Sequence, residues 1–231
     1  LTALDQQRLL EVSRSAGGAV RIEVQVGDYI YPGTHLATLA ADADDDTVDM
    51  ARDAFATGAT RTPHQDVRLT IVELVDIAAK ALSPGINDPT TAMSALDRLG
   101  ELLLEIGRRI RPAVHQAEDG ATLITNLPDF DDYLRLSFGQ IAQYAAGQVS
   151  VSERMFNVIG SIGPLLPPAR RQSLARLVAH LEPRLLAPLV QSADRDAVLF
   201  AVARAERRLK GDGARNGGAG VVEQDHATPT G

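Results

Sequence analysis

Side chains that could do chemistry are concentrated between residues 61 and 90, in the stretch RTPHQDVRLTIVELVDIAAKALSPGINDPT. Guanidinium, carboxylate and amide groups lie at both ends of a nearly all-apolar segment, and two more carboxylates lie within it. Such groups can bind a cation or a small ligand, or transfer protons in acid–base catalysis. The same residue types also cap helices, because their oxygens accept hydrogen bonds from the first turn. No catalytic role can be assigned. The candidate ligand-binding residues are Arg61, Thr62, Gln65, Asp66, Glu73, Asp76, Ser83, Asn87 and Asp88.

Two of these carboxylates, Glu73 and Asp76, lie three residues apart within the apolar segment. On a helix this spacing brings both side chains to one face. If that face is buried, the pair favours sharing a proton or binding a cation. Asp76 also lies four residues before Lys80, which is the favourable order for an ion pair on an exposed helix. A site and an ordinary charged stripe therefore remain alternatives.

The other candidates flank this helix at its two ends. About 20 residues of helix separate two groups by about 30 Å, so one site would need a further element or a second copy of the chain. Thr62, Pro63 and Gln65 match a capping box with proline at the first helical position, and Asp88 followed by Pro89 matches a second cap. Capping leaves Arg61, Ser83 and Asn87 unexplained, so a polar binding cluster stays open as the alternative.

Several classes of site are excluded by what the chain lacks. It has no cysteine, which rules out disulfides, thiolate nucleophiles and cysteine–zinc sites. Its five histidines show no metal-ligand spacing. A nucleophile elbow, a P-loop and a dinucleotide fingerprint are also absent from the sequence. We therefore expect no cofactor and no metal.

The elements that position the candidates follow from hydrophobic periodicity. Apolar residues alternate with polar ones over 20–26, which predicts a strand with one wet face, and short strands are expected at 29–31 and 36–39. The Asp119-Gly120 pair predicts a hairpin of 113–117 with 121–125. The helix over 67–82 is apolar around most of its girth, so we expect it at the centre of the fold. Helices are predicted over 5–15, 47–58, 67–82, 89–109, 129–146, 150–162, 168–186 and 193–210.

These elements predict a mostly helical α+β fold. Aromatic residues make up only 4% of the chain, so the core must consist mainly of Leu, Ile, Val and Ala. The expected organisation is a β-rich cap over 1–42, resembling half of a barrel-sandwich, packed on a helical domain over 43–210 that carries the hairpin near 113–125. Residues 211–231 are Gly-rich, polar and aperiodic, so a disordered tail is predicted there.

Charge is distributed unevenly along the chain, whose net charge is −7. Residues 1–166 carry 13 Lys and Arg against 23 Asp and Glu, whereas residues 167–210 carry 9 against 4. The acidic body excludes nucleic acid as a partner, since phosphates require a positive surface. The basic end can contact anionic lipid, or it can be a solvated helical face. The residues for lipid contact are Arg170, Arg171, Arg204, Arg207 and Arg208.

The order of the motifs resembles a known family. LTALD is followed by VQVGDYIYPGTHL, RTPHQD, ALSPGINDPTTA and LDRLG. Over about residues 1–200 this order is similar to the bacterial predicted membrane proteins grouped as domain of unknown function 2254. In that family the motifs follow a block of transmembrane helices. No apolar run here reaches the ~18 residues needed to span a bilayer, and residue 1 is Leu, so the chain resembles the soluble C-terminal portion of such a protein.

The resemblance implies a bacterial cell membrane and the family's own N-terminal transmembrane region as a partner, with no assigned activity. We expect a non-catalytic regulatory or assembly domain, on the cytoplasmic side and homo-oligomeric because its central helix is so apolar. One alternative is a cation- or small-ligand-binding domain, with hydrolase activity as an option, built on Asp66, Glu73, Asp76, Asn87 and Asp88. The other is a peripheral lipid-binding domain that uses the arginine-rich last helices.

Overall fold

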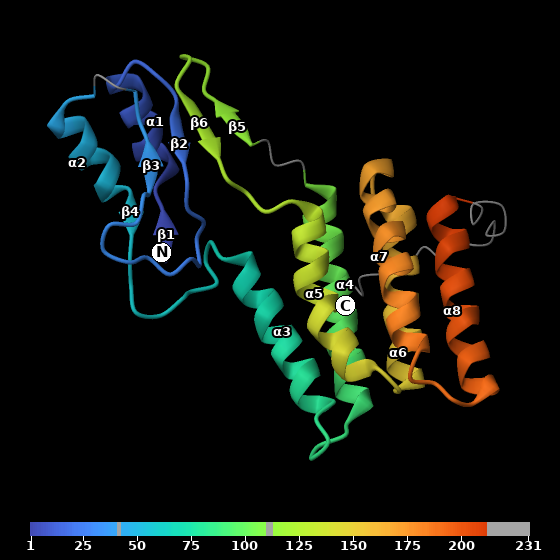
Figure 1. Cartoon of the computed structure of the whole chain (residues 1–231). Coiled ribbons are helices and arrows are strands. Elements are labelled where there is room, and N and C mark those ends of the chain that lie inside the picture. Colours follow the sequence, from blue (N-terminus) through green and yellow to red (C-terminus); the bar gives the residue numbers. More distant parts are fainter. Residues whose placement is uncertain (41–42, 110–112, 212–231) are drawn as a thin grey trace, which may run out of the picture.

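The computed structural model describes residues 1–40, 43–109 and 113–211. Within them the chain builds two hydrophobic cores, one in a small α/β cap and one in a helical bundle (Figure 1). The predicted mostly helical α+β class, with a small N-terminal cap that contains the strands, is confirmed.

The cap contains two helices and two small sheets. The larger sheet has the order β3-β2-β6-β5, in which β2 pairs parallel with β6 and the other pairs are antiparallel; β1 and β4 pair separately. Val20 and Ile22 point into the core while Arg21 points out, as the alternation predicts. The cap elements are β1 (Ala3–Leu4), α1 (Gln6–Ser15), β2 (Val20–Ile22), β3 (Ala37–Thr38), α2 (Asp45–Asp53), β4 (Phe55–Ala56), β5 (Val114–Gln116) and β6 (Thr122–Thr125).

The bundle is built around α6, which packs against α4, α5, α7 and α8. Its fully buried residues Val151, Met155 and Ile159 recur at helical spacing along the inner face. Gly160 allows α8 to come close, because a Cβ at this position would lie 2.8 Å from the Cα of Ala205. The bundle elements are α3 (Val67–Ala81), α4 (Pro89–Arg108), α5 (Phe130–Ala145), α6 (Val149–Ile162), a 3-10 turn (Gly163–Leu165), α7 (Pro168–Leu186) and α8 (Ser192–Lys210).

The predicted central position of the helix over 67–82 is wrong. Helix α3 lies at one side of the bundle (Figure 1) and packs mainly against α4 and α5. Its outer face exposes Glu73 and Asp76, and the side chain of Ile77 is 47% exposed. The apolar circumference of α3 shows how much of this helix could be buried. It does not decide its position, because α6 also has apolar faces and lies at the centre of the bundle.

All eight predicted helices are present, with shifted ends. The largest shift is in α2, which begins at Asp45 and ends at Asp53 instead of covering 47–58. The hairpin near 113–125 is present as β5 and β6. The strand expected at 29–31 is absent, and the rings of Tyr29 and Tyr31 are exposed in a loop.

The cap core contains residues from beyond position 42, where the sequence predicts the helical domain to begin. Residues of α2, β4 and the hairpin, namely Ala51, Phe55 and Leu123, are buried in the cap core. The division into domains at residue 42 stays a prediction. The predicted tail over 211–231 lies outside the described residues apart from Gly211.

Candidate functional site

The candidate residues at the start of α3 lie where the cap meets the bundle. Asp66 is the N-cap of α3, and its Oδ1 accepts a hydrogen bond of 3.0 Å from the backbone N–H of Leu69. Its Oδ2 accepts from Nε and Nη2 of Arg61, both at 2.7 Å. The side chain of Asp66 is 1% exposed and that of Arg61 is 37% exposed. This carboxylate is therefore buried, neutralised by an ion pair and used as a cap.

The capping box predicted from Thr62, Pro63 and Gln65 is wrong. The helix begins at Val67, four residues later than that motif requires, and Thr62 lies exposed in the preceding turn. Gln65 bonds instead to the cap: its Oε1 accepts from the N–H of Leu4 at 2.9 Å, and its Nε2 donates to the carbonyl of Leu4 at 3.3 Å. Asp66 is the N-cap residue of α3 instead of Thr62, because its buried carboxylate reaches the first turn of the helix.

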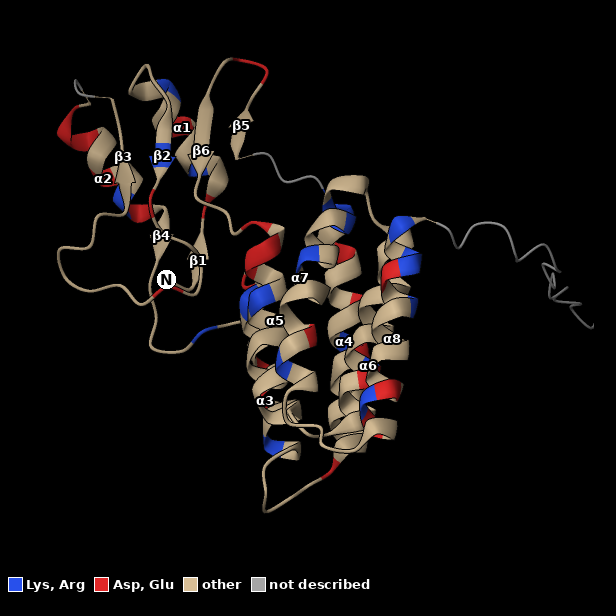
Figure 2. Ribbon diagram, turned by 45° about the vertical axis from the view of Figure 1, so that its right-hand side comes forward, with Lys and Arg blue, Asp and Glu red and all other residues tan. Residues whose placement is uncertain are grey.

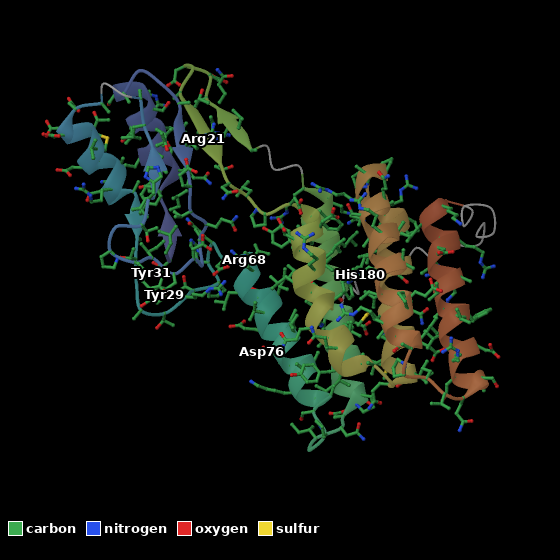
Figure 3. All side chains as sticks on the ribbon, viewed as in Figure 1. Arg21, Tyr29, Tyr31, Arg68, Asp76 and His180 are labelled. Carbon is green, nitrogen blue, oxygen red and sulfur yellow. The ribbon has the colours of Figure 1, made fainter. Side chains whose placement is uncertain are left out.

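A second arginine extends this connection. Nη1 of Arg68 donates to Oε1 of Gln25 at 3.0 Å and to Oδ1 of Asp28 at 3.2 Å. Figure 3 shows Arg68 at the first turn of α3, next to the cap. We call the set Arg61, Gln65, Asp66 and Arg68 the clip. Gln65 and Arg68 bond to the β-containing cap, and the Arg61–Asp66 ion pair lies against the turn at Gly27.

The turn at Gly27 fits closely against the clip. Gly27 has a φ of +96°, which favours glycine. A Cβ at this position would lie 2.5 Å from Oδ2 of Asp66 and 2.7 Å from Nη2 of Arg61. The sequence marks Gly27-Asp28 as a turn, but nothing local in it indicates this contact across 39 residues.

The candidates at the far end of α3 form a separate, local turn. Asp88 caps α4 as predicted, accepting from the N–H of Thr91 at 3.1 Å and from its hydroxyl at 2.5 Å, with Pro89 at the first helical position. The Thr91 hydroxyl bond lowers the pKa of the Asp88 carboxyl. The hydroxyl of Ser83 donates to the carbonyl of Lys80 at 2.7 Å. Asn87 has a φ of +48° and accepts from Gln148 at 3.3 Å.

Of the two alternatives for Glu73 and Asp76, the exposed charged stripe is the one present on α3, and a buried carboxylate pair does not form. Glu73 and Asp76 are both exposed, and Figure 3 shows Asp76 on the outer side of the helix. The ion pairs of the described residues do not include one between Asp76 and Lys80. The structure thus brings Arg61, Gln65 and Asp66 together and leaves the other candidates apart.

Beside the clip, a cleft of about 630 Å³ opens between the cap and the bundle. Its apolar wall includes Ile22, Val24 and Leu123 from the cap. Its polar residues include His64, Arg68, Arg109 and His115, which come from four different segments. Sequence reasoning missed Arg109 and His115, because only the return of the chain to the cap sheet places them here.

The arginines considered for lipid contact lie on α7 and α8. The start of α7 and the end of α8 are adjacent, and Figure 2 shows Lys and Arg at both of these ends. Arg170 lies over the ring of Phe130, 5.2 Å from its centroid. Arg204 donates to Asn157, and Arg208 donates to the hydroxyl of Ser161 at 2.9 Å. Nε of Arg171 is buried without a hydrogen-bond partner among the described atoms.

The fold defines a class of domain in which a small β-containing cap lies on a six-helix bundle. Among the described residues, no group of three or more His, Cys, Asp or Glu could hold a metal ion. The family model for predicted membrane proteins, domain of unknown function 2254, matches residues 1–161, and the chain belongs to this family. The resemblance inferred from RTPHQD and ALSPGINDPTTA is therefore confirmed. Among the described helices, none combines the length and apolar character needed to cross a bilayer.

The chain is similar to mycobacterial proteins whose names assign no function. It is 26% identical over 214 residues to the uncharacterized proteins Mb1321c of Mycobacterium bovis and Rv1290c of Mycobacterium tuberculosis, covering 89% of this chain and 41% of each relative. It is 29% identical over 151 residues to the uncharacterized protein MT1328 of M. tuberculosis, covering 64% of this chain and 29% of that relative. The chain thus spans less than half the length of these relatives. No solved structure matches it significantly.

Proposed function

We propose that this chain is a non-catalytic regulatory and assembly domain of a multi-pass bacterial membrane protein, placed on the cytoplasmic side. The observation that carries the proposal is the clip, in which Gln65 and Arg68 bond to the cap while Asp66 is paired with Arg61. A proton-transfer or cation site needs a carboxylate that can reach its substrate. Asp66 is instead enclosed by Arg61, Gly27 and the first turn of α3.

The surface that supports assembly is the outer side of α3 with the neighbouring loop of the cap. Ile77 is exposed on α3, and Figure 3 shows Tyr29 and Tyr31 in the cap loop, toward the same side of α3 as Asp76. The two rings lie 4.7 Å apart, centroid to centroid. Exposed aromatic and branched apolar side chains are typical of protein interfaces. A second copy of the domain is the partner that the proposal assigns to this surface.

Light scattering of the full-length parent protein in detergent tests the assembly role. We expect Ile77→Glu to reduce the mass of the oligomer to a smaller species, because a carboxylate buried in an interface without a partner is strongly unfavourable. Val190→Glu is the matched control, since Val190 is 93% exposed in the turn between α7 and α8 and lies outside the assembly surface. An unchanged mass for Ile77→Glu, or an equal loss for both variants, contradicts the proposal.

A second candidate function, contact with anionic lipid, is favoured by the adjacent basic ends of α7 and α8. Each basic residue near an anionic membrane contributes about 1 kcal/mol of binding free energy. We expect the double change Arg207→Gln and Arg208→Gln to weaken co-sedimentation with phosphatidylserine vesicles roughly tenfold or more. Arg98→Gln is the control, because Arg98 is exposed on α4 and paired with Glu101. Binding that added salt does not weaken argues against this function.

A further inference from the structure

The cleft between the cap and the bundle has the composition of a ligand site, and the clip forms only one part of its border. Its volume of about 630 Å³ falls within the range of small-molecule sites, which is roughly 300–1,000 Å³. Such sites combine apolar walls with a few polar groups that fix the orientation of the ligand. This cleft has both: the sheet of the cap supplies apolar side chains, and the ends of α3 and α4 supply cations.

The apolar wall is continuous with the core of the cap. Ile22 and Leu123 belong to β2 and β6, which pair in the sheet, and both are almost fully buried. Val24 continues the same face beyond the end of β2 and is half-buried. Leu127, on the segment that leads to α5, remains exposed at the border of the cleft. An apolar chain or ring placed against this wall would pack on Ile22 and Leu123 and would remove the exposed parts of Val24 and Leu127 from water.

The polar groups that line the cleft include hydrogen-bond donors that are still available, whereas the carboxylate in the lining is already paired. Asp66 is the carboxylate of the lining, and Arg61 and the first turn of α3 already occupy it. Arg68 uses Nη1 for Gln25 and Asp28, while its Nε and Nη2 make no hydrogen bond within the described residues. Nη2 of Arg109 forms an exposed ion pair with Oε2 of Glu105 at 3.8 Å, a distance too long for a hydrogen bond, so its N–H donors stay available.

Two histidines add further hydrogen-bonding groups to the cleft. The rings of His64 and His115 line the cleft, and neither makes a hydrogen bond in the described parts of the chain. A neutral imidazole can donate from one nitrogen and accept at the other. A cation would meet two guanidinium groups here, whereas an anion would meet donors from both sides of the cleft.

We propose that this cleft binds a small amphiphilic anion, whose apolar part lies against Ile22, Val24 and Leu123 and whose anionic group lies between Arg68 and Arg109. The inference deepens the regulatory role proposed above, because it names the chemical class of the molecule that the domain would sense. The binding itself does not depend on assembly, so the two can fail separately.

Calorimetric titration of the chain with three eight-carbon probes tests the inference. Octanoate, octanol and octylammonium share one apolar chain and differ in charge. We expect octanoate to bind at least tenfold more tightly than the other two, because only its head group accepts charge-assisted hydrogen bonds from both arginines. Equal binding of octanoate and octanol, tighter binding of octylammonium, or no detectable binding of octanoate at about 10 mM overturns the proposal.

Variants locate the binding site. Arg109→Gln should weaken octanoate roughly tenfold and leave octanol unchanged, since a charge-assisted bond is lost. Arg108→Gln is the matched control at the adjacent position, because Arg108 is exposed and bonds to the carbonyl of Leu165 outside the cleft. Leu127→Trp should obstruct the cleft and abolish binding of octanoate. Loss of binding in Arg108→Gln equal to that in Arg109→Gln, or full binding in Leu127→Trp, places the ligand elsewhere and overturns the assignment.

Discussion

The Asp66→Ala variant is expected to lose about 3 kcal/mol of unfolding free energy, the lower end of the range for breaking a buried ion pair. The lower end applies because Arg61 is partly exposed and can recover some hydration. The same change removes the N-cap of α3 and the acceptor for the N–H of Leu69. Urea unfolding at neutral pH, followed by circular dichroism, measures the loss.

Two further variants separate the two roles of Asp66. Asp66→Asn keeps an oxygen that can cap α3 but removes the charge that pairs with Arg61, so most of the loss should remain. Asp88→Ala removes an N-cap of almost the same geometry from a partly exposed position, without an ion pair among the described residues, and should cost clearly less. Equal losses for Asp66→Ala and Asp88→Ala would show that the buried ion pair adds nothing to the cap.

Gly27→Ala is expected to destabilise the fold by a comparable amount, about 3 kcal/mol, from left-handed strain and overpacking together. The new Cβ would lie 2.5 Å from Oδ2 of Asp66, whose other oxygen is held by the first turn of α3. The carboxylate therefore has little room to move away. Thermal unfolding of the variant measures the loss, and hydrogen exchange at Leu69 should rise because the start of α3 is disturbed.

The matched control is Gly33→Ala. Gly33 has a φ of +89°, close to that of Gly27, but no atom lies within 4 Å of the Cβ that alanine would add. It should show only the strain of the left-handed region, about 1 kcal/mol. If both variants lose the same stability, the close approach of the Gly27 turn to the clip has no energetic weight.

The parts of the fold that were predictable are those decided within a few residues of sequence. Asp88 and Pro89 begin α4 as expected, because a cap and its proline act on the turn that directly follows. Periodicity over ten or more residues likewise located the eight helices. The position of α3 could not be predicted in this way, since burial depends on which other helices compete for the centre of the bundle.

The candidate site was predictable only in part, for a similar reason. Arg61, Gln65 and Asp66 stood out because they precede an apolar helix, and the structure brings them together. Their partners Leu4 and Gly27 lie far away along the chain, so the sequence favoured a local capping box that does not form. The cleft depends on the pairing of β2 with β6, which no local sequence pattern predicts.

That parallel pairing makes the cap discontinuous along the chain. A fragment ending before α3 would contain β2 but not β6, leaving one edge of β2 unpaired and Val20 without its neighbour Leu123. The cap is therefore not one continuous segment of the chain. Evolutionary recombination and protein engineering alike must keep residues 1–125 together, so helices α3 and α4 are inherited with the sheet they interrupt.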